Sequence, residues 1–256
     1  MNCYDLTKMT WKEVKKSLET VEFAIIPVGA HEQHGPHMAE SCDAVLAEKM
    51  AIKLGERMFP YTIVTPVVNM GVSEHHMHFP GTIALQPATL IAVLTDMVSS
   101  LKQHGIEKFL FLNSHGGNQS TLNLAAMTIT KELEVEVYYA KTTASAKESI
   151  GRFVKSPLFG HSCEREVSEA LYLAPDLVRT ELLQKGDIQE DGRWERLRPG
   201  KAVQGFYFYE EMTRNGCIGD GRHGSREIGE QIVEEALRNL VEELSELFDL
   251  KAEMLY

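Results

Sequence analysis

The chain has 256 residues, of which 43% are hydrophobic and 25% are charged, the balance of an ordinary globular protein. Its 26 lysines and arginines against 37 aspartates and glutamates give a net charge of −11, which argues against nucleic acid or a membrane as a partner. No apolar run approaches the roughly 20 residues that cross a bilayer, the N-terminus lacks the apolar core of a signal peptide, and the four cysteines form no CxxC pair. We therefore expect a cytoplasmic protein without a disulfide framework or a zinc ribbon.

Segments typical of strands and of helices alternate along the chain. In order, the sequence predicts a strand over 22–28, a helix over 43–58, a strand over 62–68, a helix from Pro87 that Gly105 ends, a strand over 108–112, a helix over 120–133, a strand over 135–140, and helices over 164–173 and 226–250. This alternation predicts an α/β fold, with a mostly parallel sheet covered on both faces, in a single domain over residues 1–256. The irregular stretch 186–224 is expected to run over one edge of that domain.

The histidines are unevenly distributed, with six of the ten between His31 and His78. Four polar clusters each come after a predicted strand: HEQHGPH, GVSEHHMHFPGT, NSHGGNQS and, after a further loop, GHSCERE. Ligands bind at the carboxyl ends of the strands in parallel sheets. We therefore expect these clusters, although far apart in the sequence, to meet at one edge of the sheet.

The first cluster offers a carboxylate and an imidazole on one side of the chain. Glu32 and His34 are two residues apart, so in extended chain both side chains point the same way. Such a pair suits a divalent metal such as Zn²⁺ or Mn²⁺, and Asp43, at the start of the next helix, could reach the same point. The pattern also permits a structural reading, in which Asp43 is only a helix N-cap and His31 and His37 are loop residues.

The third and fourth clusters add further candidate ligands. His115 follows a buried strand and precedes Gly116 and Gly117, which would let the backbone approach a ligand closely at a helix N-terminus; the alternative is a glycine turn capped by Asn118. In the fourth cluster, His161 is followed by two glutamates, 164 and 166. On a helix these point about 200° apart, so only one of them is expected to face the site.

Together these blocks resemble the four signature blocks of the creatininase (creatinine amidohydrolase) family, which also includes formamide deformylases and a peptidase of redox-cofactor maturation. The matching segments are GAHEQHGPH with its following Asp, GVSxxHxxFPGT, NSHGGN and H-S-C-x-x-E-x-S. The similarity runs from about Ala24 to Ser168, with a weaker match from Gly219 to Gly229. The resemblance implies a three-layer α/β/α sandwich with a mostly parallel sheet, in agreement with the periodicity. It also implies a metal-dependent hydrolase.

The family binds two divalent metal ions per subunit, here expected to be Zn or Mn, with Fe as an alternative. Matched block to block, the resemblance implies five ligands: the pair Glu32 and His34, the bridging Asp43, His115 and Glu166. Creatininase proper has a Glu where this chain has Gly117, whereas relatives of the HGGN form keep one at the position of Glu166. Glu164 is the second candidate for this role.

The resemblance also implies a catalytic residue. His161 matches the family's proton-transfer histidine, and Glu164 is the next catalytic candidate. Independently of the resemblance, we expect Ser73, His76 and the backbone of Gly116 and Gly117 to hold the substrate or a developing oxyanion. Creatininase proper has a Glu at the position of Gly160 and tryptophans over its pocket, but Trp11 and Trp194 lie outside the matching blocks. These departures argue against creatinine itself as the substrate.

The expected reaction is attack by a metal-activated water on a cyclic amide or formamide C–N bond of a small molecule. The same site would also suit opening of a lactone or of a cyclic ketone such as an inosose. A metal-storing protein is disfavoured because structural zinc sites are usually closed and cysteine-rich. A dinucleotide-binding domain is set aside because no GxGxxG follows the first strand. The resemblance further implies a homo-oligomer, namely a hexamer.

Overall fold

A parallel sheet of five strands runs through the middle of the computed structural model, which describes residues 3–190, 192–198 and 200–250. The strands are β1 (Tyr4–Asp5), β2 (Phe23–Val28), β3 (Thr62–Val64), β4 (Lys108–Asn113) and β5 (Glu136–Lys141), and their order in the sheet is β1-β3-β2-β4-β5. In the register of the central strands, Val28 lies opposite Asn113, which lies opposite Lys141. The carboxyl ends of β2, β4 and β5 therefore lie side by side.

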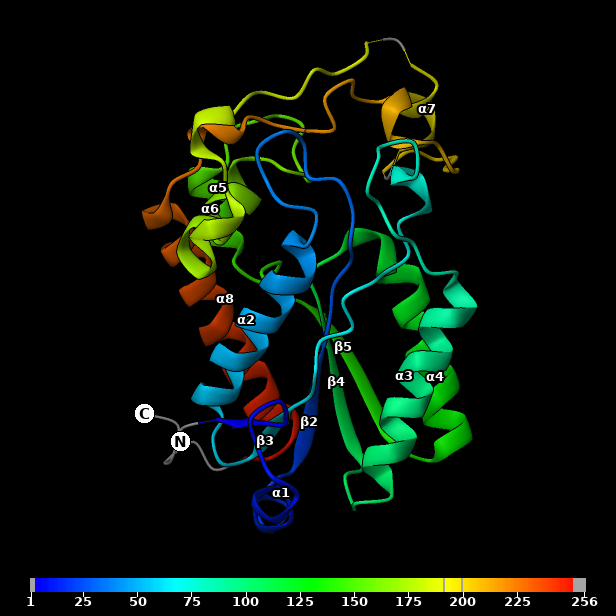
Figure 1. The fold of residues 1–256 in the computed structure, drawn as a ribbon, viewed down its shortest axis with the longest axis vertical. Coiled ribbons are helices and arrows are strands. Elements are labelled where there is room, and N and C mark those ends of the chain that lie inside the picture. Colours follow the sequence, from blue (N-terminus) through cyan, green and yellow to red (C-terminus); the bar gives the residue numbers. More distant parts are fainter. Residues whose placement is uncertain (1–2, 191, 199, 251–256) are drawn as a thin grey trace.

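Helices cover both faces of the sheet (Figure 1). On one face lie α2 (Cys42–Arg57), α5 (Lys147–Phe153), α6 (Glu164–Leu173) and α8 (Arg226–Leu247), and on the other lie α3 (Pro87–Lys102) and α4 (Gln119–Leu133). Two further helices are short, α1 (Trp11–Ser17) and α7 (Trp194–Leu197), and the 3₁₀ turns are η1 (Glu74–His76), η2 (Gly116–Asn118), η3 (Pro175–Leu177), η4 (Thr180–Leu182), η5 (Tyr209–Glu211) and η6 (Gly221–His223). Among the described residues, every helix is too short or too polar to span a bilayer.

Alternate residues of β2 pack into two separate cores. Phe23 and Ile25 join residues of α2 and α8, whereas Ala24 and Ile26 join residues of α3 and α4. This is the period of two that a strand imposes on its side chains, and all six residues of β2 are buried. The predicted three-layer α/β/α sandwich with a mostly parallel sheet is thereby confirmed.

The structure differs from the sequence prediction mainly in the length of the elements. The strand expected over 62–68 ends at Val64, because Pro66 cannot donate a hydrogen bond to the ladder; pairing resumes only at a bridge between Val28 and Val68. The last helix ends at Leu247, three residues before the predicted end. The short elements β1, α1 and α5 were not predicted.

The described residues of the irregular stretch, 186–190, 192–198 and 200–224, fold over the carboxyl edge of the sheet, as expected (Figure 1). This stretch has a small core of its own, in which Trp194, Tyr209, Met212 and Ile218 are buried and Phe79 packs against them. We refer to residues 186–224 as the cap. Because the cap covers the edge at which the strands end, it encloses the place where the polar clusters were expected to meet.

Candidate metal centre

The local fold places Asp43 directly beside the ends of the central strands. Asp43 lies in the first turn of α2, two residues beyond the N-cap, which is Ser41. The hydroxyl of Ser114, which follows β4, donates a hydrogen bond to the backbone carbonyl of Asp43 at 2.6 Å. The start of α2 is thus tied to the carboxyl end of β4, with the Asp43 side chain free for another role.

The carboxylate of Asp43 lies between two imidazoles. Its Oδ1 is 3.4 Å from Nε2 of His34, and its Oδ2 is 3.1 Å from Nδ1 of His115. The three side chains are almost fully inaccessible to solvent. Each carboxylate oxygen therefore faces a different histidine, the arrangement expected of a group that bridges two ions.

Glu32 completes this arrangement on one side. Its Oε1 lies 3.3 Å from Nδ1 of His115, 3.3 Å from Nε2 of His76 and 3.7 Å from Nδ1 of His161. The side chain is only 1% exposed. A buried carboxylate surrounded by three imidazoles is a typical donor set for a divalent cation.

Several polar atoms of this centre are buried without a hydrogen-bond partner in the described part of the chain, which bears on whether a cation would fit there. Oε2 of Glu32, Nε2 of His34 and Oδ2 of Asp43 are buried and have no hydrogen-bond partner among the described residues. Ligand atoms of these three residues lie within 4.8 Å of one another. Buried polar atoms without partners are costly, and a cation would satisfy all three, so the residues fit a metal ion.

A second group of candidate ligands shares His34 with the first. Ligand atoms of His34, His161 and Glu166 also lie within 4.8 Å of one another. The carboxylate of Glu166 accepts hydrogen bonds from the backbone N–H of Ser162 at 2.5 Å and from the guanidinium of Arg165 at 3.0 Å. Of the five ligands that the family resemblance implies, Glu32, His34, Asp43 and Glu166 belong to these two groups, which share His34, and His115 lies beside Glu32 and Asp43.

Gly117 cannot carry the carboxylate that creatininase proper has at this position. A Cβ atom there would lie 2.3 Å from Nε2 of His115 and 2.4 Å from the carbonyl oxygen of Val72. With this backbone, the glycine block contributes His115 alone. The carboxylate of Glu166, on α6, lines the cavity at the centre.

Glu164 is not brought to the centre. Its carboxylate accepts backbone hydrogen bonds from Lys155 at 3.1 Å, Ser156 at 2.8 Å and Asp220 at 3.0 Å. Burial favours the neutral acid, but these bonds hold the pKa of Glu164 below its usual value. Of the two glutamates, Glu166 lines the cavity, whereas Glu164 joins α6 to neighbouring loops.

Ser73 lies behind a ligand instead of in the cavity. Its hydroxyl is 3.4 Å from Nε2 of His115, and that nitrogen donates to the carbonyl oxygen of Val72 at 3.1 Å. These contacts leave Nδ1 of His115 facing the carboxylates of Glu32 and Asp43. A hydrogen bond on the far nitrogen is the usual way in which proteins orient a metal-binding imidazole.

Gln33 orients two further histidines. Nε2 of His161 donates to the backbone carbonyl of Gln33 at 2.7 Å, and the side-chain amide of Gln33 donates to Nδ1 of His76 at 2.9 Å and to the carbonyl of Gly216 at 3.1 Å. This network assigns the proton of His161 to Nε2. The other ring nitrogen, Nδ1, therefore faces the centre as a hydrogen-bond acceptor.

The histidines divide into two classes by pKa. Burial opposes a charge on His34, but the carboxylate of Asp43 raises its pKa to about 9, and Glu32 and Asp43 together raise the pKa of His115 well above its usual value. For His161, burial and the neighbouring His34 lower the pKa. The metal-free centre therefore holds protons on His34 and His115 and keeps His161 neutral near pH 7.

The two carboxylates show the complementary effect. Burial alone would favour the neutral acids, but the imidazole of His115 lowers the pKa of Glu32, and those of His34 and His115 lower the pKa of Asp43 strongly. Both carboxylates are therefore ionised near neutral pH. Their charges are balanced by protons on two histidines when no cation is bound.

A cavity of about 370 Å³ opens onto the centre. The lining residues that the sequence prediction did not include among the site residues are His75, whose ring stacks 5.8 Å from that of His115, together with Ser114, Gly160 and, from the cap, Gly205, Phe206, Tyr207 and Tyr209. The aromatic run 206–209 in an otherwise irregular stretch was the available signal for the cap residues. The predicted His76, Gly116, Gly117 and His161 line the cavity, whose size suits a small molecule.

The sequence matches one family model and several characterised proteins. The creatininase model, described as creatinine amidohydrolase, matches residues 7–244. The chain is 32% identical to creatinine amidohydrolase of Pseudomonas putida over 43% of this chain and 44% of that one. It is 28% identical to 3-dehydro-scyllo-inosose hydrolase of Thermotoga maritima over 68% of this chain and 57% of that one, and 26% identical to mycofactocin precursor peptide peptidase of Mycolicibacterium smegmatis over 88% and 85%. The matches thus span about half the length of the first two relatives.

Solved creatininase structures share the fold. A type II mutant creatininase, with 25% sequence identity, superposes with a TM-score of 0.83 over 96% of this chain and 99% of that one. A manganese creatininase and a Zn–Zn form of a mutant creatininase, each 24% identical, both superpose with a TM-score of 0.82 over 96% of this chain and 99% and 98% of theirs. These likenesses confirm the α/β architecture.

Binding of a divalent cation at pH 7 is expected to release protons. With a pKa of about 9 for His34 and a raised pKa for His115, both rings are protonated at pH 7, whereas a cation binds only the neutral imidazole. The apparent affinity should therefore rise as the pH increases from 7 to about 9. Titration calorimetry in two buffers with different heats of ionisation counts the protons; binding without proton release at pH 7 would contradict the assignment of these two ligands.

Proposed function

The chain belongs to the creatininase family of hydrolases, and from this we propose that it cleaves a cyclic amide or formamide C–N bond in a small molecule with the help of two divalent metal ions. The carboxylate of Asp43, placed between His34 and His115, is the observation that carries the proposal. It supports a bridge between two cation positions. The buried atoms without partners on Glu32, His34 and Asp43 support the same conclusion.

The proposed ligands divide between two positions that share Asp43. Glu32 and His115 would hold one cation, and His34 and Glu166 the other, with His161 as the alternative ligand at the second position. Carboxylate and imidazole donors suit Zn or Mn, and Fe is the further alternative. When bound, two such cations polarise a carbonyl group and lower the pKa of water from about 15.7 towards about 7.

His161 is proposed to transfer the proton. Its Nδ1 faces the cavity as an acceptor, because Nε2 donates to the carbonyl of Gln33. The lowered pKa keeps the ring neutral and able to take up a proton. Nδ1 could then pass that proton to the nitrogen of the leaving amine, a task suited to an imidazole near neutral pH.

Other residues of the cavity are proposed to hold the substrate. The backbone of Gly116 and Gly117 lines the cavity just before α4, where N–H groups suit a developing negative charge on oxygen. His76 is the proposed side-chain contact, and Tyr209 packs on its ring with centroids 4.1 Å apart. Ser73 would act indirectly, by orienting His115.

Creatinine itself is disfavoured by the walls of the cavity. Gly160 lines it where creatininase proper has a Glu. Trp194 is buried in the core of the cap, where its indole N–H donates to Gln189 at 2.8 Å, and Trp11 is 70% exposed on α1. The aromatic wall consists instead of Phe206, Tyr207 and Tyr209, which supports a different substrate.

A second candidate function is the opening of a ring that contains no amide. The similarity to the inosose hydrolase of Thermotoga maritima supports a lactone or a cyclic ketone as the substrate class. The metal centre would be the same, since activation of water and of a carbonyl group does not depend on which bond to the carbonyl carbon is cleaved. The role of His161 separates the two candidates, because only the amide requires a proton on a leaving nitrogen.

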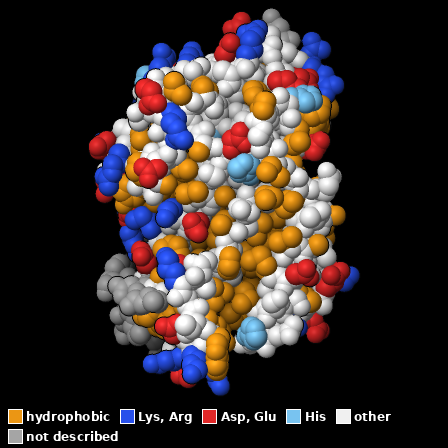
Figure 2. Space-filling model, in the orientation of Figure 1, with side chains coloured by type: hydrophobic (Ala, Val, Ile, Leu, Met, Phe, Trp, Pro, Cys, Tyr) orange, Lys and Arg blue, Asp and Glu red, His pale blue; other side chains and the backbone are white. Residues whose placement is uncertain are grey.

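A homo-oligomer, a hexamer by family resemblance, is part of the proposal. Large hydrophobic side chains are exposed on the outer helices, including Val93 of α3 and Leu124 and Met127 of α4. Figure 2 also shows hydrophobic side chains gathered in the lower middle of one face. Exposed apolar surface of this kind supports contact between subunits.

Replacement of Asp43 is expected to remove both metal ions. Asp43→Ala should lower the metal content from about two ions per chain to below one, because a bridging carboxylate serves both positions, whereas Glu32→Ala should lose the ion on its own side first. Metal content is measured by mass spectrometry after gel filtration, and removal of both ions should abolish hydrolysis. A variant Asp43→Ala that keeps two ions would show that the bridge is assigned wrongly.

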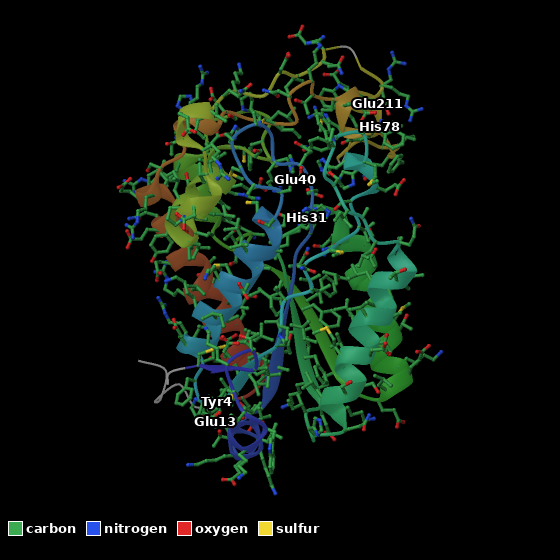
Figure 3. The ribbon with its side chains drawn as sticks, viewed as in Figure 1. Tyr4, Glu13, His31, Glu40, His78 and Glu211 are labelled. Carbon is green, nitrogen blue, oxygen red and sulfur yellow. The ribbon has the colours of Figure 1, made fainter. Side chains whose placement is uncertain are left out.

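Glu40→Gln is the matched control for Asp43→Ala. Glu40 lies three residues before Asp43 and faces His31 at 3.5 Å, outside the cavity (Figure 3). Its side chain is 32% exposed and has no part in the candidate metal groups of the described residues. This variant should keep both ions and full activity, so that a loss confined to Asp43→Ala reports on the bridge.

His161→Ala is expected to keep both ions and lose activity. A general acid or base contributes about 10² to 10⁴-fold to a rate, and the loss should be smaller for a lactone or for an amide whose leaving group needs no proton. Activity and metal content are measured on the same preparation. Loss of an ion would make His161 a ligand in place of Glu166, and unchanged activity would make it a structural residue.

A further inference from the structure

A second cavity, of about 280 Å³, adjoins the first. Five residues line both cavities: Ser114, His115, Gly116, Gly160 and Glu166. The other walls of the second cavity come from the segment after β5 and from the start of α6. A molecule bound at the metal centre could therefore extend into it.

Two of the five residues shared by the cavities are glycines, which leave part of the boundary free of side chains. Gly160 has a φ of +149°, a conformation that favours glycine, and a Cβ atom there would meet nothing within 4 Å. A Cβ atom on Gly116 would also meet nothing within 4 Å. Because Gly160 immediately precedes His161, the opening lies on the side of the centre where the leaving amine would receive its proton.

Two cationic side chains line the second cavity. Lys141, the last residue of β5, is exposed and has no ion-pair partner among the residues that the structure describes. Nε of Arg165 is buried and makes no hydrogen bond within the described ranges. Thr142 and Thr143 are buried lining residues beside them. The hydroxyl of Thr143 already donates to Glu169 at 2.8 Å, whereas that of Thr142 makes no hydrogen bond among the described residues and is available as a donor.

The guanidinium of Arg165 is held in place by two carboxylates. It donates to Glu166 at 3.0 Å, and its Nε lies 3.5 Å from Glu169. The proposed function assigns the negative charge of Glu166 to a cation. With two divalent cations bound, those ions, Lys141 and Arg165 carry six positive charges against four carboxylates, those of Glu32, Asp43, Glu166 and Glu169.

We propose that the second cavity binds a carboxylate group of the substrate. This inference rests on the proposed function and narrows its substrate class to N-formyl and N-acyl amino acids, with the carbonyl at the metal centre and the carboxylate beside Lys141 and Arg165. Water adds its oxygen to the carbonyl carbon, the C–N bond breaks, and the nitrogen leaves with a proton from that water. The products are a carboxylic acid and a free amino acid.

Matched pairs of ligands test the proposal on the metal-loaded protein. N-formylalanine and N-formylalaninamide differ only in the charge of the group that the second cavity would bind, and their kcat/KM values are compared. Succinate and butyrate, which contain no amide bond, are compared by titration calorimetry. N-formylalanine should have a kcat/KM about 10- to 100-fold higher than N-formylalaninamide, the effect of one charge-assisted hydrogen bond. Succinate should bind about 10- to 100-fold more tightly than butyrate for the same reason.

Lys141→Gln and Arg165→Gln should each lower two ratios by about a factor of 10 or more. These are the ratio of kcat/KM values for the two formyl compounds and the ratio of affinities for succinate and butyrate. Lys147→Gln, a change to an exposed lysine of α5 that lines neither cavity, is the matched control and should leave both unchanged. Metal content is measured for every variant, because Arg165 contacts Glu166. If Arg165→Gln loses metal or fails to fold, the result for Lys141→Gln alone decides the test.

The possible outcomes separate this inference from the proposed function. If the formyl compounds are hydrolysed without a preference for the carboxylate, the second cavity is not a carboxylate site. If succinate is preferred equally by the wild type and by Lys141→Gln, its second carboxylate binds elsewhere, and the inference is also overturned. If no amide is hydrolysed but the succinate preference depends on Lys141, the carboxylate site stands and the proposed amide chemistry fails.

Discussion

The cost of burying the carboxylates of Glu32 and Asp43 is the constraint on which the rest of the centre depends. Two negative charges almost fully removed from water must be balanced. In the metal-free protein, His34 and His115 provide the balance by holding protons, as their raised pKa values indicate. The same rings offer their nitrogens to a cation once those protons leave. Protons and metal ions therefore compete for one set of atoms, and the fold fixes where those atoms lie.

The surrounding residues decide which histidine does what. His115 is turned toward the carboxylates because its other nitrogen donates to Val72, and His161 presents an unprotonated nitrogen because its other nitrogen donates to Gln33. The Nδ1 atom of His161 lies 3.7 Å from Glu32, whereas that of His115 lies 3.3 Å from it. The pKa of His161 is lowered, whereas the pKa of His115 is raised. A difference in neighbours thus separates a proposed ligand from a proposed proton carrier.

Much of the fold could be predicted from the sequence because it depends on local patterns, whereas the proposed ligand set came from the family resemblance. Buried strands are recognisable as short apolar runs, and helix geometry already limits the glutamates of α6 to one that faces the site. The rest depends on contacts between distant segments. Three features arise only when separate loops converge: the hydrogen bonds of Gln33 to His161 and Gly216, the place of Ser73 behind His115, and the presence of Lys141 and Arg165 in the lining of one cavity. Short elements such as β1 and α5 carry too few residues for a periodic signal.

Anomalous diffraction from crystals grown with Mn²⁺ tests the central claim most directly. The account predicts two peaks roughly 3.5–4 Å apart, with Asp43 between them, one beside Glu32 and His115 and the other beside His34 and Glu166. A single peak, or a pair of ions that Asp43 does not contact, would contradict it.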